Sequence, residues 1–480
     1  MVAAPSTPGN TNWSSRLAFV LAAVGSAVGL GNLWRFPTEA GANGGGAFVL
    51  IYILCVVLIG LPLLLSETII GRHAQQNAVA STVAMAHQSG ASGGWAALAW
   101  FGMLASFMVL TFYSVVAGWV LYFIGATGLD WFGAIGDGRP FAGAFSGGSV
   151  EDIRELMPAL FADPVRLTLM HLLFAALTIF VVARGVNQGI EKAATWLMPA
   201  FFILLLLITI YSGVTGDFGA AFSFLFTPDF SRVFDPKVLN SALGQAFFSL
   251  SLGSAIMVTY GAYASRDTNL AQTSAWIAAA DTSVALIAGL AIFPVVFAVG
   301  LDPAAGPTLM FQTLPSAFHA MPGGALIALL FFVLAFFAAL TSSVSLLEVV
   351  VAWISERFGL RRPLAALLIG GGFFVVGLFS VFAFNIWEHH RPLAFLPGFE
   401  EANWFDAFDG VTGRILLPLS GLITAVFIGW IADRRLVDPE SGLRSGGLLP
   451  VWRFLVAWLC PIAVGLILVF SLFPQLISTS

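Results

Sequence analysis

Charged side chains are scarce in this 480-residue sequence: Lys and Arg together number 20, Asp and Glu number 25, and these four types make up only 9% of the chain. Soluble domains contain about 25% charged residues, so the composition excludes a soluble globular protein. The net charge of −5 is spread thinly, with no basic stripe to neutralise a phosphate backbone. We therefore expect no nucleic acid among the partners.

Cysteine is almost absent as well. Only Cys55 and Cys460 are present, and both lie within apolar stretches. Two isolated cysteines exclude a disulfide framework and have no metal-ligand spacing. The sequence also lacks a visible pair of nucleophile and general base, so we expect a protein that is not an enzyme.

Apolar residues, in contrast, are abundant: 59% of the chain is hydrophobic and the mean hydropathy is +0.93. A bilayer core about 30 Å thick is crossed by about 20 apolar helical residues. Eleven stretches meet this requirement, so the predicted fold class is an all-α polytopic membrane protein. The predicted spans are 16–36, 45–71, 95–124, 167–184, 190–213, 239–264, 272–299, 324–357, 363–385, 410–431 and 453–473.

The orientation in the membrane is predicted from Lys and Arg in the connections. If the N-terminus is cytoplasmic, the cytoplasmic side receives twelve of these residues and the opposite side eight. Eleven spans then place the C-terminus outside. Residues 1–15 are polar and lack the features of a cleavable signal, so we expect a cytoplasmic tail on a multi-pass protein of the cell inner (plasma) membrane.

The first span is interrupted by the run GSAVGLGNLWRFP, which contains Gly25, Gly29 and Gly31. Each glycine costs about 1 kcal/mol relative to Ala inside a helix, so three in seven residues predict a break. Open helix ends in a membrane offer carbonyl oxygens to cations and N–H groups to anions. The alternative is that the glycines only allow a neighbouring helix to approach closely.

The sixth span has a similar interruption, in the run GQAFFSLSLGSAIMVTYGAY from Gly244 to Tyr263. Two discontinuous helices five apart indicate an inverted repeat of five helices, with a binding site near the bilayer midplane. We therefore predict a first repeat over 16–213, a second over 239–431 and an eleventh helix at 453–473. The eighth span adds hydroxyls in AALTSSVSLL, which act either as contacts between helices or as cation ligands.

Three runs, GSAVGLGNLWRFP, FFSLSLG and ALTSS, occur in the order and at the separations of a known family. In them the chain resembles a bacterial, eleven-helix member of the neurotransmitter:sodium symporter family. The resemblance covers helices 1 to 10 and implies two sodium sites. The first would use Ala27, Asn32, Ser249 and Asp281, and the second would use Gly25, Val28, Ala338, Thr341 and Ser342.

The resemblance also implies a substrate site between the two helix breaks. Tyr113 and Phe248 would form its lid. An aspartate of monoamine carriers is replaced here by Gly29, so the substrate is expected to bring its own carboxylate, as an L-amino acid does. Ser254 replaces a bulky aromatic residue and favours a roomy pocket for hydrophobic or aromatic side chains. The expected substrate residues are Ala27, Gly31, Val109, Tyr113, Phe248, Ser249, Ser251, Ser254, Ser342 and Leu346.

Gates on both sides of the membrane follow from the same resemblance. On the outer side Arg35 would pair with Asp409 or Asp406. On the inner side Trp13 and Glu356 match the family. The basic residue expected before the tryptophan is missing, because Asn10 stands there, and Arg16 or Arg266 is the expected substitute.

Three further residues would support the machinery. Glu67 resembles a family residue that holds the broken backbones. Gly189 and Pro199 enclose nine residues of helix 5, a spacing associated with local unwinding that opens a water path to the second sodium site. A static proline kink is the alternative.

The resemblance thus predicts a sodium-coupled L-amino-acid symporter that works by alternating access in the lipid bilayer, with no obligate protein partner evident. Asp281 supplies a fixed negative charge where chloride-requiring relatives have neutral residues, so chloride is not expected to be required. The rival hypothesis is a proton-coupled amino-acid permease of the same architecture, with Glu348 or Asp281 as proton carrier. A channel is a third possibility, but paired broken helices fit the occluded site of a transporter better than the open pore of a channel.

Overall fold

The computed structural model describes residues 12–304, 309–443 and 447–473, and within these ranges it contains helices and no β-strand. Most of the predicted tail 1–15, including Asn10, lies outside the described residues. Helices 1 to 5 are formed by α1 (Arg16–Ala27), η1 (Gly31–Arg35) and α2 (Phe36–Ala42); α3 (Gly46–Cys55), η2 (Val56–Gly60) and α4 (Leu61–Ala74); η3 (Gly93–Ala96) and α6 (Ala97–Gly136); α8 (Pro164–Ala183); and η4 (Val186–Glu191) with α9 (Lys192–Thr215).

Helices 6 to 11 continue the chain, and shorter helices connect the spans. Helices 6 to 11 are α11 (Pro236–Ser249) with α12 (Ile256–Ala262); α13 (Leu270–Ala298); α15 (Gly324–Phe358); α16 (Arg362–Phe382); α17 (Trp404–Val411), η7 (Thr412–Leu416), α18 (Leu417–Val426) and η8 (Phe427–Ile431); and α20 (Leu449–Phe454), η9 (Leu455–Leu459) and α21 (Cys460–Leu472). The connecting helices are α5 (Ala78–Gln88), α7 (Val150–Phe161), α10 (Phe218–Phe226), η6 (Leu309–Thr313), α14 (Leu314–His319) and α19 (Arg434–Ser441).

Nine helical segments of the described chain are long and apolar enough to cross a membrane. A tenth span is the pair Arg16–Ala27 and Gly31–Ala42, which is bent by 48° at its break. The predicted span 239–264 is divided between α11 and α12, each too short to cross a bilayer alone. The all-α polytopic fold with discontinuous helices 1 and 6 is thereby confirmed. The repeat boundaries stay a prediction.

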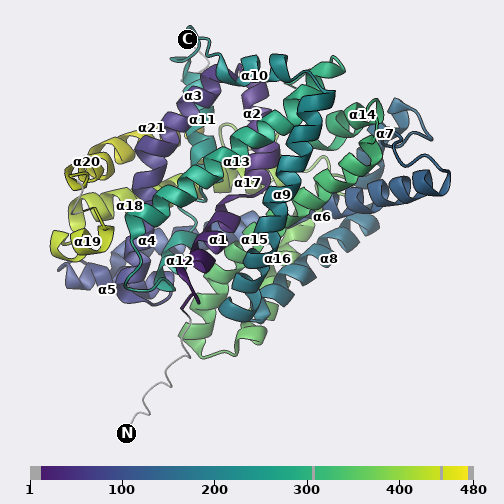
Figure 1. Ribbon diagram of the computed structural model, residues 1–480. Helices are drawn as coiled ribbons and strands as arrows, with labels where there is room; N and C mark the ends of the chain where they lie inside the picture. The colour runs from purple at the N-terminus through teal and green to yellow at the C-terminus, as the bar shows by residue number, and fades with distance from the viewer. Residues whose placement is uncertain (1–11, 305–308, 444–446, 474–480) are drawn as a thin grey trace.

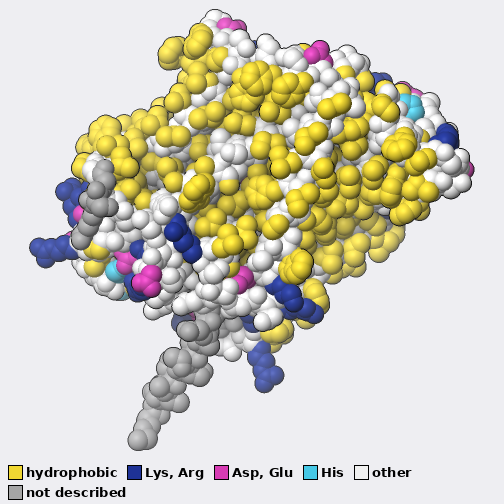
Figure 2. Space-filling model, in the orientation of Figure 1, with side chains coloured by type: hydrophobic (Ala, Val, Ile, Leu, Met, Phe, Trp, Pro, Cys, Tyr) yellow, Lys and Arg dark blue, Asp and Glu magenta, His cyan; other side chains and the backbone are white. Residues whose placement is uncertain are grey.

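The third span is longer than expected, because α6 runs to Gly136 instead of ending at residue 124. In Figure 1, α1 and α12 lie in the middle of the bundle, while α19 and α20 lie at one edge and α7 at the other. Figure 2 shows hydrophobic side chains over the broad middle of the visible face, and Lys and Arg gathered mainly at its lower end. This distribution is that of a protein surrounded by lipid.

The half-helix α12 is held against helix 2 by close backbone contacts. A Cβ on Gly71 would lie 1.8 Å from the carbonyl oxygen of Val258, and one on Gly261 would lie 2.5 Å from that of Thr68. Small residues let membrane helices pack at such short range. This packing positions the break of helix 6 beside Glu67 of α4.

Candidate functional site

The break in helix 1 exposes backbone groups that side chains then bind. Helix α1 ends at Ala27, and the backbone N–H of Gly29 donates to the side-chain oxygen of Asn32 at 3.0 Å. The N–H of Leu30 donates to the Tyr113 hydroxyl at 3.3 Å. The backbone N–H groups of Gly29 and Leu30 are therefore bound by side chains, as burial in a membrane requires.

The break in helix 6 spans residues 250–255, between α11 and α12. Its backbone is left-handed at Ser251, Gly253 and Ala255, with φ of 54°, 73° and 60°. The N–H of Gly253 donates to Oε1 of Glu67 at 2.7 Å. Glu67 therefore contacts the broken backbone of helix 6, and its other carboxylate oxygen is buried with no hydrogen-bond partner among the described residues.

Carbonyl oxygens of helix 1 converge on one hydroxyl of α15. The Ser342 Oγ lies 3.4 Å from the carbonyl oxygen of Gly25 and 3.3 Å from that of Val28. The carbonyl of Ser26, which the sequence did not single out, is nearest at 3.2 Å. One hydroxyl carries one proton, so it satisfies at most one of these three acceptors.

The other predicted members of this second site lie on the same helix. Thr341 Oγ1 donates within α15, to the carbonyls of Phe337 at 3.0 Å and Ala338 at 3.1 Å. A Cβ added to Gly25 would be 3.3 Å from the Thr341 Cβ, so helix 1 and α15 are in contact here. The structure thus brings the five predicted residues of the second sodium site together.

A second polar cluster joins helices 1, 2, 6 and 7. The Asn32 side-chain nitrogen donates to Asp281 Oδ1 at 2.8 Å, and the Ser249 hydroxyl donates to Asp281 Oδ2 at 2.7 Å. Tyr52, which sequence reasoning missed, donates to Oδ2 at 3.3 Å. All four side chains are buried. Asp281 therefore lies in direct contact with two predicted ligands of the first sodium site, and Ala27 lies at the cavity described next.

Between the two helix breaks lies a cavity of about 40 Å³, here called the inner cavity. It is lined by nine of the ten predicted substrate residues, the exception being Ser249. A volume this small holds one or two water molecules, so an amino acid enters only if side chains move. The Ser254 hydroxyl donates to the carbonyl of Ser251, and the roomy pocket expected from Ser254 is not present in this conformation. The lining residues outside the predicted substrate set are Ser26, Gly29 and Leu417.

Gly29 faces a crowded part of the inner cavity. A Cβ at this position would lie 2.7 Å from the Ser342 Oγ and 3.0 Å from the Tyr113 hydroxyl. The space beside Gly29 is therefore filled by these two side chains in this conformation. The glycine allows helices 1, 3 and 8 to meet at one point.

A larger cavity of about 590 Å³, here called the vestibule, shares Gly31, Tyr113 and Phe248 with the inner cavity. Tyr113 and Phe248 thus stand at the boundary between the two cavities, where a lid was predicted. Arg35 and Asp409 both line the vestibule, and Asp406 does not.

The predicted ion pair between Arg35 and Asp409 or Asp406 is not formed among the described residues. The Arg35 guanidinium lies over the Phe248 ring, 4.6 Å from its centroid, and its Nε is 3.9 Å from Glu39. The cation–π contact holds Arg35 above the predicted lid. The vestibule is therefore open in this conformation.

The opposite end of the bundle is closed around Trp13. The indole N–H donates to the Tyr260 carbonyl at 3.2 Å, and the Trp13 backbone N–H donates to the Tyr263 carbonyl at 3.1 Å. The next residue, Ser14, donates its backbone N–H to Glu191 at 3.0 Å and also contacts this carboxylate through its hydroxyl. Glu191 was missed by sequence reasoning.

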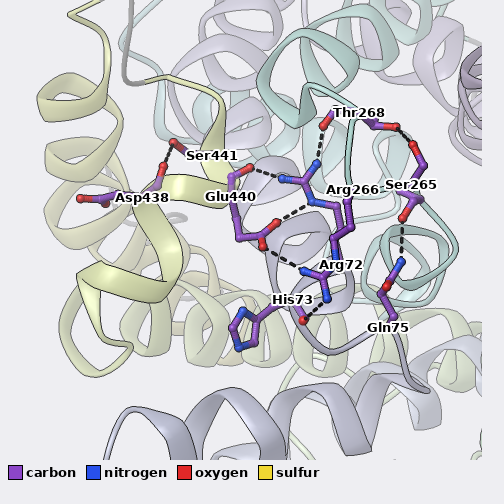
Figure 3. A network of polar contacts seen from close by, with 10 residues as sticks. Arg72, His73, Gln75, Ser265, Arg266, Thr268, Asp438, Glu440 and Ser441 are labelled. Atoms are coloured by element: carbon purple, nitrogen blue, oxygen red, sulfur yellow. Dashed lines mark hydrogen bonds and ion pairs between the residues drawn. The ribbon is translucent and has the colours of Figure 1, made fainter.

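Neither expected substitute for the missing basic residue takes its place. Glu356 accepts hydrogen bonds from the Asn77 backbone and side chain, at 3.0 and 2.6 Å, with no cation beside it among the described residues. Arg266 pairs with Glu440 at 3.2 Å (Figure 3), and Arg16 is exposed. The expectation that Arg16 or Arg266 completes an ion pair with Glu356 is therefore wrong in this conformation.

Glu348, buried on α15, has two partners of its own. Tyr263 donates its hydroxyl to Oε1 of Glu348 at 2.7 Å, and Arg362 at the start of α16 forms an ion pair with Oε2. The same Tyr263 accepts the backbone hydrogen bond of Trp13. The closed end therefore includes a chain of contacts from helix 1 through α12 to helices 8 and 9.

The segment between Gly189 and Pro199 is helical here. It begins in the π-helical turn η4 and continues into α9, which contains Pro199. A Cβ on Gly189 would lie 2.0 Å from the carbonyl oxygen of Val181, so glycine is required for the contact of this turn with α8. Glu191, the partner of Ser14, lies within the same segment.

Comparison with known proteins gives consistent matches. The sequence model of the sodium:neurotransmitter symporter family matches residues 10–131 and 155–389. The chain is 36% identical to the sodium-dependent transporter YhdH of Bacillus subtilis over 455 residues, which cover 94% of this chain and 95% of the relative. It is 31% identical to a sodium-dependent transporter of Haemophilus influenzae, covering 96% and 98%. The crystal structure of MhsT in complex with L-phenylalanine matches with a TM-score of 0.84 at 38% identity, covering 97% of this chain and all of that one.

Proposed function

Because the chain belongs to the sodium:neurotransmitter symporter family, whose members are sodium-coupled transporters and not enzymes, we propose that it imports L-amino acids together with sodium by alternating access. The observation that carries this proposal is the pair of oxygen-rich sites beside one inner cavity, each built where a membrane helix is interrupted. Broken helices with such oxygens bind coupling ions in transporters.

The helix-1 carbonyls beside Ser342 suit a sodium ion because they are hard oxygen donors with no net charge. A single hydroxyl proton leaves at least two of the carbonyls of Gly25, Ser26 and Val28 unsatisfied by it. A cation bound there would use oxygens that the protein has already brought together. Thr341 and Ala338 would complete this second site.

The cluster around Asp281 suits the first sodium ion. Asn32 contacts this carboxylate through its side-chain nitrogen and Ser249 through its hydroxyl, so a cation entering the cluster would meet one full negative charge and the Ser249 oxygen. The Asn32 oxygen, which accepts the N–H of Gly29, would have to turn toward the cation to bind it. Burial of an uncompensated charge is expensive, which favours binding of a cation beside Asp281. The same fixed charge removes the need for chloride.

The substrate that we assign to the inner cavity, once its side chains have moved apart, is an L-amino acid with a hydrophobic or aromatic side chain. Val109, Phe248 and Leu346 supply apolar walls, and the sodium ion of the first site would bind the substrate carboxylate. The solved relative MhsT was crystallised with L-phenylalanine, which supports this class of substrate.

Alternating access would then exchange an open vestibule for an open path on the side of Trp13. With the N-terminus in the cytoplasm, substrate enters from outside past Arg35, and the lid residues Tyr113 and Phe248 close over it. Release requires the contacts of Trp13 and Ser14 to break. Unwinding of the segment between Gly189 and Pro199 would help to break them, because Glu191, which accepts the hydrogen bond of Ser14, lies in that segment.

Equilibrium binding to the purified protein tests the proposal. We expect radiolabelled L-phenylalanine to bind in sodium chloride and not in choline chloride or potassium chloride. Phenethylamine, which lacks the carboxylate, should fail to compete. Binding that is independent of sodium, or that a decarboxylated amine displaces as well as the parent amino acid, would contradict it.

A further inference from the structure

A third cavity lies at the edge of the bundle, between helices 10 and 11 and the short helix α19. Its volume is about 240 Å³. In Figure 1, α19 and α20 lie at the outer edge of the molecule, far from the central α1 and α15. The lining combines two arginines, Arg434 and Arg453, with apolar side chains that include Trp452, Phe454 and Trp458.

Two acidic residues near this cavity form ion pairs with arginines. Glu440 is held between Arg72, whose Nε lies 2.6 Å from it, and Arg266, as Figure 3 shows. Asp438 points away from that network and forms an ion pair with Arg453. Glu440 and Asp438 are therefore already neutralised, and a third carboxylate, Asp433 at the start of α19, accepts the backbone N–H of Arg435 at 2.8 Å.

Arg434 remains available on the cavity wall. It is exposed, as is Arg435 beside it, and neither side chain forms an ion pair with any described residue. Arg453 contacts Asp438 through Nε and Nη2, and no contact of its Nη1 with a described residue is seen. The cavity thus presents guanidinium groups that a further anion would satisfy.

An apolar stripe leads from this cavity along helix 11. Five exposed side chains recur every three or four residues on one face of this helix, and over this stretch the helix rises about 22 Å. That length is comparable to an extended acyl chain. The stripe consists of Phe454, Trp458, Ile462, Leu466 and Val469.

We propose that this cavity and stripe bind one anionic phospholipid. The phosphodiester contacts Arg434 and Arg453, and an acyl chain lies along the helix-11 stripe. Basic pockets between membrane helices bind anionic headgroups in this way, and tryptophans such as Trp430 and Trp458, whose rings are 4.7 Å apart, mark the level of the headgroups. A free phosphate ion would leave the stripe unused.

Native mass spectrometry of the full-length protein in detergent tests this site, with phosphatidylglycerol and phosphatidylcholine titrated separately. We expect the wild type to bind phosphatidylglycerol about 10-fold more tightly than phosphatidylcholine. Arg434→Ala should weaken phosphatidylglycerol about 5-fold and phosphatidylcholine less, because the choline cation of the second lipid offsets the charge of the same phosphodiester. Trp458→Ala should weaken both lipids.

The matched control is Arg357→Ala combined with Arg361→Ala, which removes two exposed arginines, one in the last turn of α15 and one at the start of α16. This control should bind phosphatidylglycerol like the wild type. Equal affinity of the wild type for both lipids, or an equal loss in the control, would overturn the proposal. So would displacement of phosphatidylglycerol by equimolar inorganic phosphate, or a dimer that excludes the lipid, because a free anion or a second copy would then be the occupant.

Discussion

The backbone N–H of Ser14 donates a hydrogen bond of 3.0 Å to the carboxylate of Glu191, a residue 177 positions later in the chain. This contact ties the start of helix 1 to the segment of helix 5 that was predicted to unwind. Trp13 is bound next to it by the carbonyls of α12. The structure therefore closes this end of the bundle with hydrogen bonds that Glu191 and α12 accept, where relatives were expected to use an ion pair.

Replacing Glu191 with Ala should open this end. Hydrogen bonds to a charged group contribute about 1.5–3 kcal/mol, so the closed state should lose about 10- to 100-fold in population. Amide hydrogen exchange of residues 14–19 measures the change directly and should accelerate. Glu401→Ala, at an exposed carboxylate, is the control and should exchange like the wild type. Unchanged exchange in Glu191→Ala would contradict a latch at this position.

Removing the hydroxyls of Thr341 and Ser342 together should abolish uptake driven by sodium. Ser342 faces the helix-1 carbonyls that we assign to the second sodium ion, and Thr341 packs beside Gly25. The matched control is Ser343→Ala, because the Ser343 hydroxyl contacts Thr178 at 3.0 Å on another side of the same helix. Sodium titrations of substrate binding should show a lost site in the double variant and a normal curve in the control. A double variant with normal sodium affinity would refute the assignment.

Replacing Asp281 with Asn should lower sodium affinity, and chloride should partly restore it. The variant keeps the shape of the side chain and removes its fixed negative charge, which an anion bound nearby can replace. Uptake by the wild type should be equal in gluconate and in chloride. Tyr52→Phe removes only one of three donors to this carboxylate and should have a smaller effect. A wild type that stalls without chloride would rule out this role of Asp281.

A methyl group at position 29 should be poorly tolerated. In Gly29→Ala the new Cβ would meet Ser342 and Tyr113 at 2.7 and 3.0 Å, an overlap that costs about 1–3 kcal/mol. We expect substrate affinity to fall about 5- to 100-fold while the protein remains folded, as measured by binding of L-phenylalanine. Gly125→Ala on α6 has no atom within 4 Å and should bind normally. Equal affinity of the two variants would show that the close contact at Gly29 is not needed.

The sequence was most informative where a residue type is costly in a membrane. Three glycines in helix 1 and the run from Gly244 to Tyr263 in helix 6 predicted both breaks. Such breaks are tolerated in a membrane only where the open backbone is buried in protein or lines a cavity. Glu67 was also placed next to a broken backbone, as the structure shows.

Partners across the fold were harder to predict. Tyr52 lies in an apolar stretch with no polar neighbour to mark it, and its contact with Asp281 depends on how helices 2 and 7 pack. Glu191 stood at the start of the predicted span 190–213 with nothing to mark a partner, and only the folded chain brings Ser14 to it. The open vestibule and the small inner cavity belong to one conformation of a moving protein, which no sequence pattern specifies.

Uptake into proteoliposomes tests the coupling of transport to sodium most directly. One charge crossing 100 mV gains about 2.3 kcal/mol and a tenfold gradient adds about 1.4 kcal/mol, so two sodium ions supply roughly 7 kcal/mol. That energy is enough to concentrate substrate about 10⁵-fold. With L-phenylalanine outside, we predict concentrative uptake under an inward sodium gradient at equal pH, stimulated by an inside-negative potential. Uptake driven by a pH gradient in sodium-free choline buffer, and unaffected by sodium, would contradict sodium coupling and favour a proton-coupled permease.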